Sequence, residues 1–213
     1  MMHLSQLILN GRSRQARRDL ANPYQLHRTV MSAFPAKLPE DERVLFRLEI
    51  HPRHKAPVLL VQSLRRPEWS ELPAGYLLPL QSSGWPVENP AVKQVELHFL
   101  PGQTLAFRLR ANPTVKRQGK RYGLFKEDEQ QAWMRRKSAE AGCELLSLQV
   151  GSDSRLKGWQ PQEDGSVRRL EFYAVTFEGN LRVLCPDDLL AAIQSGIGSG
   201  KGLGFGLLSL APG

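Results

Sequence analysis

Tyr24 and His27 are the residues whose types and spacing most directly suggest chemistry. They lie three positions apart in a segment that follows Asn22-Pro23, and this spacing places both side chains on one face of a helix. An imidazole can take or give a proton near neutral pH, and guanidinium groups can stabilise charge that grows on a phosphate. The arginines close to the pair in sequence are Arg17, Arg18 and Arg28. Together these residues predict a site for phosphodiester cleavage, and a surface or helix-packing role for His27 is the alternative.

A second basic segment lies in the middle of the chain, from Arg108 to Gly123. Pro113 ends strand pairing and Gly119 permits a turn, so Lys116, Arg117, Lys120 and Arg121 are expected around the tip of a hairpin. Such a tip can be pressed against a nucleic-acid backbone, and a solvated charged hairpin is the alternative. The cations predicted to bind nucleic acid here are Arg108, Arg110, Lys116, Arg117, Lys120 and Arg121.

Near the C-terminus, glycine occupies every second position from Gly196 to Gly206, with Lys201 among them. A glycine-rich backbone can approach a ligand closely and direct its N–H groups at oxyanions, which predicts phosphate contacts at Gly198, Gly200 and Lys201. The spacing fits neither a Walker P-loop nor a G-x-G-x-x-G register. A flexible tail is the alternative, although apolar residues interrupt the glycines.

The sequence predicts no metal or cofactor site. His51 and His54 flank Pro52-Arg53, but no third ligand stands nearby. The two cysteines are not in a paired motif, and the acidic residues do not cluster in the way that two-metal nuclease chemistry requires. A nuclease of this sequence is therefore expected to be metal-independent.

The overall composition favours a polyanionic partner. The 213 residues are 41% hydrophobic, which is enough for a core, and carry a net charge of +8. The basic residues are spread among turns and strands instead of forming one amphipathic helix, so nucleic acid is a better partner than a membrane. No run of 18 apolar residues and no signal peptide is recognised, which predicts a cytoplasmic protein.

The first half of the chain predicts four strands and a helix. Strands are expected at His3–Asn10, Val44–Ile50, Val58–Leu64 and around Val95–Phe99. A helix should begin at Asn22-Pro23 and end near Phe34, burying Leu26, Val30 and Ala33. The stretch from Arg66 to Pro90 holds five prolines and is expected to be mostly loop, with one helical turn near Tyr76–Leu80 as the weaker second helix of this half.

The second half repeats this order after a hinge at Pro101-Gly102. A strand around Leu105–Leu109 precedes a helix at 126–141, and a shorter helix is expected at Pro186–Gln194. Further strands are expected at Glu144–Val150, Arg168–Phe177, Asn180–Leu184 and after the glycines, with a tight hairpin at Gly179-Asn180. The fold class is therefore α+β, with two tandem ferredoxin-like β-α-β-β-α-β domains at residues 1–100 and 103–213. RNA-recognition modules share this topology, but their aromatic sheet signature is missing.

Four segments in this order resemble one family. They are Arg17–Arg28, Phe107–Pro113 with Gly119–Arg121, Phe177–Gly179, and Gly196–Pro212. Together they resemble the CasE family of type I-E CRISPR systems, the endoribonucleases that process CRISPR precursor RNA. The resemblance extends over essentially the whole chain.

The resemblance implies a function and site residues. It implies metal-independent cleavage on the 3′ side of the repeat stem-loop, a 2′,3′-cyclic phosphate product, and continued binding to that RNA with the other subunits of the Cascade complex. The family's histidine and tyrosine map onto His27 and Tyr24. Some members carry a lysine a few residues after the histidine, where this chain has Met31 and Ser32, so Arg168 or Arg169 is expected to supply that cation. Rivals are a non-catalytic RNA-binding module of the same fold and a purely structural subunit.

Overall fold

The computed structural model describes residues 1–79, 88–162 and 164–213, which form two compact units. The first unit comprises Met1–Glu96 together with two segments from farther along the chain, Lys157–Leu170 and Gly202–Gly204. The second comprises Leu97–Leu156, Glu171–Lys201 and Phe205–Gly213. The assignment of domains to residues 1–100 and 103–213 stays a prediction.

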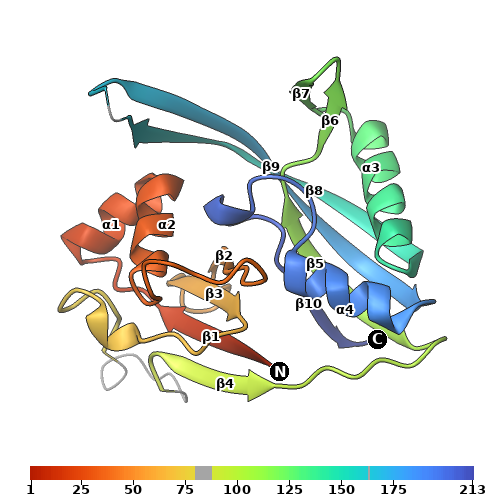
Figure 1. Cartoon of the computed structure of the whole chain (residues 1–213), viewed down its shortest axis with the longest axis horizontal. Coiled ribbons are helices and arrows are strands. Elements are labelled where there is room, and N and C mark those ends of the chain that lie inside the picture. The colour runs from red at the N-terminus through yellow and green to blue at the C-terminus, as the bar shows by residue number, and fades with distance from the viewer. Residues whose placement is uncertain (80–87, 163) are drawn as a thin grey trace. The chain divides into compact units, whose positions relative to one another are not determined.

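In the first unit, four antiparallel strands form a sheet in the order β2-β3-β1-β4 (Figure 1). This is the strand order of a ferredoxin-like fold, in which the first and third strands lie at the centre. Among the described residues between β3 and β4, which exclude 80–87, one 3-10 turn, Trp69–Glu71, lies where that fold has its second helix. The elements are β1 (Met2–Ile8), α1 (Arg14–Ala21), α2 (Pro23–Met31), β2 (Leu45–Ile50), β3 (Pro57–Ser63), the 3-10 helix η1 (Trp69–Glu71) and β4 (Ala91–Val95).

The core of the first unit confirms the predicted buried face of the helix. Leu26, Val30 and Ala33 are all buried and pack in one cluster with Phe46 of β2 and Leu59 of β3. Burying a leucine, valine or phenylalanine side chain stabilises the fold by roughly 1.5–3 kcal/mol. The sheet and the buried face of α2 therefore set where the opposite face of α2 points.

The second unit repeats the arrangement with the order β10-β5-β9-β8 and adds a separate two-stranded ribbon, β6-β7. Figure 1 shows α3 and α4 beside one another along this sheet. Trp133 of α3 stacks on Phe177 of β9, with ring centroids 5.6 Å apart. The ends of β8 and β9 within Lys157–Leu170, and the residues of η3 after Lys201, belong to the first unit. The elements are β5 (Thr104–Ala111), β6 (Thr114–Arg117), β7 (Lys120–Gly123), α3 (Glu127–Glu140), β8 (Cys143–Pro161), β9 (Val167–Val183), α4 (Pro186–Ser195), the 3-10 helix η3 (Lys201–Leu203) and β10 (Leu208–Pro212).

The hairpin predicted at Gly179-Asn180 is wrong. Both residues lie inside the 17-residue strand β9, where Gly179 pairs with Phe107 and Asn180 with Ala106. A Cβ atom on Gly179 would lie 2.1 Å from the carbonyl oxygen of Ser147, so glycine is required here by the close approach of that backbone. The turn that joins the long strands β8 and β9 instead lies between Gln162 and Ser166, where the Gln162 N–H donates to the Ser166 carbonyl.

The first half differs from the prediction in one strand and in one helix. The strand around Val95–Phe99 lies earlier, at Ala91–Val95, because β4 pairs with β1 and the register ends at Met2↔Val95. Helix α1 was not predicted at all. Of the loop predicted over Arg66 to Pro90, residues 80–87 lie outside the described residues.

Candidate functional site

The face that carries Tyr24 and His27 is fixed by the start of α2, which confirms the predicted helix start. Asn22 is the N-cap, and its side-chain Oδ1 accepts a hydrogen bond from the backbone N–H of Tyr24 at 3.2 Å. Pro23 occupies the first helical position, where a missing N–H costs nothing. Because Tyr24 and His27 are both within α2 and three residues apart, they share one face of the helix.

Asn22 also binds a distant strand, which the sequence did not reveal. Its Nδ2 donates to the carbonyl oxygen of Trp159 at 3.1 Å, and the N–H of Trp159 donates to its Oδ1 at 3.3 Å. One amide side chain therefore caps α2 and also pairs with the backbone near the tip of β8. A pairing between residues 137 positions apart leaves no local pattern in a sequence.

A buried carboxylate, Asp19, joins α1 to α2 and to the loop behind them. Its side chain is fully buried and accepts hydrogen bonds from Thr29 Oγ1 at 2.6 Å, from the Tyr76 hydroxyl at 3.1 Å and from Gln15 Nε2 at 3.2 Å. Burial and the neighbouring carboxylate raise the pKa of Tyr76, so its hydroxyl stays protonated and donates. Arg18 Nε lies 3.4 Å from the same carboxylate. These bonds hold the helix that carries His27.

His27 is half-buried, and its environment keeps the imidazole neutral. Burial lowers the pKa of His27 from its ordinary value. Within the described part of the chain, its Nδ1 is buried and has no hydrogen-bond partner. The ring lies beside Phe46, and a Cβ atom added to Gly202 would lie 3.4 Å from its Cε1 and 3.6 Å from its Nδ1. A neutral imidazole that is poised in this way can accept a proton at physiological pH.

The other predicted residues near His27 are more exposed. Tyr24 is half-buried, whereas Arg17, Arg18 and Arg28 are exposed on α1 and α2. The remaining predicted cations are Arg168 and Arg169, which are exposed and belong to the segment Lys157–Leu170 that is part of the same compact unit. The first unit thus combines the half-buried imidazole of His27 and the phenol of Tyr24 with several exposed cations.

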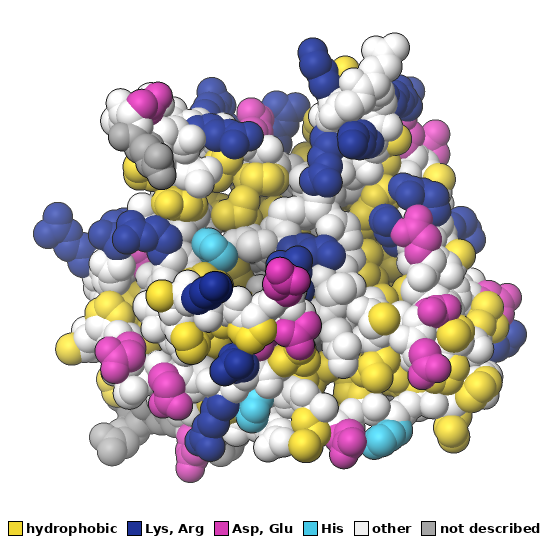
Figure 2. All heavy atoms as spheres, in the orientation of Figure 1, with side chains coloured by type: hydrophobic (Ala, Val, Ile, Leu, Met, Phe, Trp, Pro, Cys, Tyr) yellow, Lys and Arg dark blue, Asp and Glu magenta, His cyan; other side chains and the backbone are white. Residues whose placement is uncertain are grey.

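The basic hairpin has the predicted form. Strands β6 and β7 pair in the register Lys116↔Arg121 and Arg117↔Lys120, and all four side chains are exposed. Figure 2 shows Lys and Arg side chains gathered over this ribbon. Four cations on a two-stranded ribbon can contact several phosphates at once.

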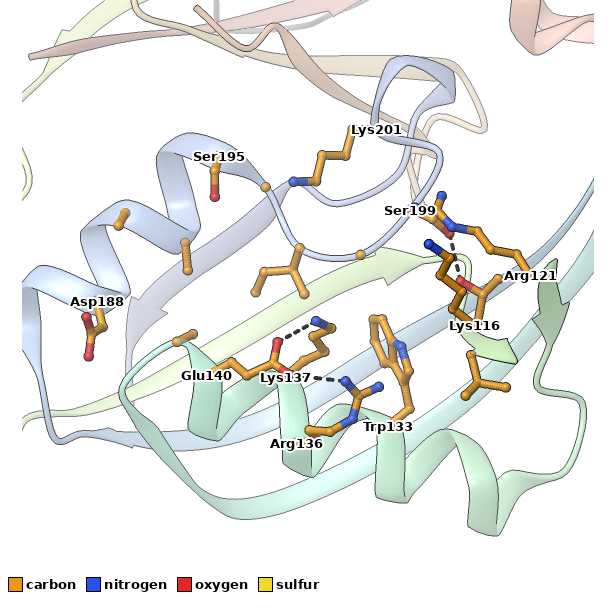
Figure 3. A pocket seen from close by; sticks show the side chains of 18 residues that line it. Lys116, Arg121, Trp133, Arg136, Lys137, Glu140, Asp188, Ser195, Ser199 and Lys201 are labelled. Atoms are coloured by element: carbon orange, nitrogen blue, oxygen red, sulfur yellow. Dashed lines mark hydrogen bonds and ion pairs between the residues drawn. The ribbon is translucent and has the colours of Figure 1, made fainter. Parts of the chain in front are cut away.

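Beside the ribbon, the second unit has a basic cavity of about 740 Å³ between α3, α4 and the glycine segment (Figure 3). Arg136 and Lys137 both pair with Glu140 at its wall. The cations that line the cavity are Lys116, Arg121, Arg136, Lys137 and Lys201. Five cations against two acidic residues, Glu140 and Asp188, favour an anionic ligand.

The glycine segment, residues 196–206, is a loop held by specific contacts, and the alternative of a flexible tail does not apply. Ser199 forms an isolated bridge with Asn112, and its hydroxyl donates to the Asn112 carbonyl at 3.1 Å. Gly198 packs against Trp133, and a Cβ atom on Gly200 would lie 2.9 Å from the Phe205 ring. Gly200 also has φ +77°, which disfavours other residues.

Arg108 and Arg110 lie on β5, away from the tip of the ribbon. Arg108 forms an ion pair with Glu178, and Arg110 lies over the ring of Phe205 at 5.8 Å from its centroid. Both contacts are intramolecular, so these two arginines also have structural partners. The structure thus gathers Lys116, Arg121 and Lys201 around one cavity but does not bring Arg108 or Arg110 into it.

His51 and His54 are the two histidines considered as metal ligands, and their ring centroids lie 4.9 Å apart. Across residues 1–79, 88–162 and 164–213, no three or more His, Cys, Asp or Glu side chains gather in a way that could hold a metal ion. In the same residues, no helix is both long and apolar enough to cross a membrane.

Comparisons with known proteins complete the description of the site. A family model described as CRISPR associated protein matches residues 2–212. The CRISPR-associated endoribonuclease Cse3 of Thermus thermophilus is 42% identical over 222 residues, which cover 99% of this chain and 100% of Cse3. The Cascade subunit CasE of the CRISPR system of Escherichia coli is 31% identical, again over 99% of this chain and 100% of CasE. A solved structure of Cse3 bound to a 19-nucleotide RNA has a TM-score of 0.84 at 42% identity and covers 99% of this chain and 100% of its own.

Proposed function

The chain belongs to the CRISPR-associated protein family, and we propose that it is an endoribonuclease that processes precursor CRISPR RNA. It binds the repeat stem-loop, cleaves at the 3′ side of the stem without a metal ion, and leaves a 2′,3′-cyclic phosphate. The observation that carries this proposal is His27, a half-buried imidazole with a lowered pKa, near several cations, on a helix that is capped by Asn22.

The reaction uses the neutral imidazole as a base. His27 accepts the proton of the ribose 2′-hydroxyl while the 2′-oxygen attacks the adjacent phosphorus. The bond from phosphorus to the 5′-oxygen of the next nucleotide breaks, and that oxygen takes a proton from water to become a 5′-hydroxyl, while the imidazolium of His27 returns its proton to water. Because Nδ1 is enclosed by protein, proton exchange with the RNA takes place at Nε2. Proton transfer of this kind contributes about 10²–10⁴-fold to the rate.

The other residues of the first unit position the RNA and stabilise charge. The Tyr24 hydroxyl, on the same face of α2, orients the reacting ribose or phosphate. Met31 and Ser32 occupy the helix positions after His27 and offer no cation there, so Arg168 or Arg169 stabilises the charge on the phosphate.

Binding depends on the second unit as well. The β6-β7 ribbon and the basic cavity hold the backbone of the stem, whose phosphates line the deep groove of an A-form helix. The protein retains its product as a subunit of Cascade together with the other subunits, and it works in the cytoplasm. Gly198 and Lys201 line the basic cavity, and Gly200 packs against Phe205 in the same loop.

The proposal is tested by incubating the purified protein with the repeat RNA of its own host in excess EDTA. We expect cleavage at one position, an upstream product that ends in a cyclic phosphate and a downstream product with a 5′-hydroxyl. Retention of intact RNA would favour the non-catalytic RNA-binding module, and a failure to bind RNA would favour a structural subunit. Activity that returns only with Mg²⁺ would contradict the mechanism.

A further inference from the structure

A second, smaller cavity lies in the second unit and has a different chemistry from the basic one. Its volume is about 300 Å³, at the lower end of the range for small-ligand sites. The residues that line it include three aromatic and three charged side chains: Phe125, Phe172, Tyr173, Arg121, Arg155 and Glu171. Flat apolar walls with a few convergent polar groups are typical of a site for a planar, polar ring.

The aromatic walls are arranged to leave ring surface available. Phe125 and Tyr173 meet edge to face, with ring centroids 5.2 Å apart and an interplanar angle of 66°. Phe125 is nevertheless 58% exposed, although it is one of the most hydrophobic residues. Arg155 lies over the Phe125 ring at 5.8 Å from the centroid, so a guanidinium plane and an aromatic ring stand together at the cavity. Proteins that bind unpaired bases stack them on such groups.

Polar groups at the same cavity can read the edge of a base. Arg155 pairs with Glu171 at 3.5 Å, and both side chains are largely exposed. A guanidinium supplies donors and a carboxylate supplies acceptors, which together can match the edge of a nucleobase.

The two cavities share a wall. Thr114, Arg121 and Ser199 line both of them, and Arg121 belongs to the basic ribbon. Ser199 is held by hydrogen bonds to Asn112 and to the hydroxyl of Thr114, so this wall is fixed in place. A strand of RNA with phosphates in the basic cavity would therefore bring a base to the aromatic one.

We propose that the aromatic cavity, defined by Phe125, Phe172, Tyr173, Arg121, Arg155 and Glu171, binds one unpaired nucleobase of the RNA whose backbone lies in the basic cavity. The inference rests on the proposed function, since it requires that the chain binds RNA. A base that is paired within the stem keeps its faces stacked and cannot enter, so the ligand is a nucleotide outside the stem. The cavity thereby adds recognition of a flanking or loop nucleotide to the electrostatic recognition of the stem.

The experiment measures affinity for repeat RNA that carries a 2′-deoxyribose at the cleavage position, which prevents cleavage. Each unpaired nucleotide is replaced in turn by an abasic one. Wild type and Phe125→Ala are compared, with Phe125→Trp as the conservative variant and Tyr122→Ala as the matched control. Tyr122 is an aromatic residue of similar exposure, 48%, on the neighbouring strand β7, and it lines neither cavity.

We expect one abasic position to weaken binding of wild type about 5- to 150-fold, the range for loss of one base stacked on an aromatic side chain. The same substitution should cost Phe125→Ala little, while Phe125→Trp and Tyr122→Ala respond like wild type. Thermal melting of each variant reports folding separately. The proposal would be overturned if no abasic position had a smaller effect in Phe125→Ala than in wild type, or if Tyr122→Ala showed the same reduction. In either case, binding and cleavage of unmodified repeat RNA by wild type would still support the proposed function. Saturable binding of a free nucleoside monophosphate with no coupling in RNA would assign the cavity to a free nucleotide and also overturn it.

Discussion

The fully buried carboxylate of Asp19 offers a direct test of how the helix that carries His27 is held. In Asp19→Asn the shape is retained but the charge is lost. Oδ2 of Asp19 accepts from both Thr29 Oγ1, at 2.6 Å, and the Tyr76 hydroxyl, at 3.1 Å. Both oxygens of Asp19 accept hydrogen bonds, so the NH₂ group of an asparagine at this position faces a donor in either orientation of the amide.

The magnitude follows from these two bonds. A hydrogen bond to a charged group contributes about 1.5–3 kcal/mol, and an amide retains part of it. We therefore expect Asp19→Asn to lower the free energy of unfolding by about 2–4 kcal/mol, which corresponds to a decrease in Tm of about 4–16 °C for a chain of this size. Thr29→Val and Tyr76→Phe should each cost less, and their effects should not be additive because both donors share one oxygen.

Urea denaturation gives the free energies by linear extrapolation, with the slope m as a check that the unfolding transition is unchanged. Glu140, an exposed carboxylate that pairs with Arg136 at 3.0 Å on the surface of α3, provides the matched control. Glu140→Gln should change stability by less than about 1 kcal/mol. If Asp19→Asn is as mild as Glu140→Gln, the view that Asp19 joins α1 to α2 is refuted.

Four further predictions concern the surroundings of His27 and the β6-β7 ribbon. A Cβ atom at Gly202 would just reach ordinary contact with His27, so Gly202→Ala should be tolerated, whereas the added methyl groups of Gly202→Val should displace the imidazole. We expect a rate loss of about 10²-fold in Gly202→Val at unchanged RNA affinity, and equal rates for the two variants would contradict the packing. Because burial lowers the pKa of His27 below 6.5, single-turnover cleavage should decline only below pH 6.5, and a decline already at neutral pH would argue against a neutral base. The unfolded chain takes up that proton first, so the free energy of unfolding should also fall as the pH drops below 6.5. Replacement of Lys120 and Arg121 by alanine should reduce the slope of log affinity against log salt by about one to two units, and an unchanged slope would place the ribbon away from the RNA.

The helix that presents Tyr24 and His27 could be predicted because its signals are local. Asn22-Pro23 marks the start by capping, and the apolar spacing of Leu26 and Val30 marks the buried face. The β6-β7 ribbon was equally predictable, since Gly119 and the flanking cations are adjacent in sequence.

What the sequence did not predict depends on pairing between distant residues. Helix α1 has a strongly basic sequence with few apolar positions. Its buried residues are Ala16, which is small, and Asp19, a residue type that is usually exposed. Gly179-Asn180 has the composition of a turn, but the glycine is there because the backbone of Ser147 approaches so closely. The pairing of Asn22 with Trp159 likewise becomes visible only in three dimensions.

The central claim is that His27 takes the proton in metal-independent RNA cleavage, and single-turnover cleavage of the host's repeat RNA by His27→Ala in excess EDTA tests it most directly. His54→Ala, which removes an exposed histidine of the same unit, is the matched control. We expect His27→Ala to lose about 10²–10⁴-fold in rate while it binds the RNA with near wild-type affinity, and His54→Ala to cleave normally. Near-normal cleavage by His27→Ala would contradict the claim.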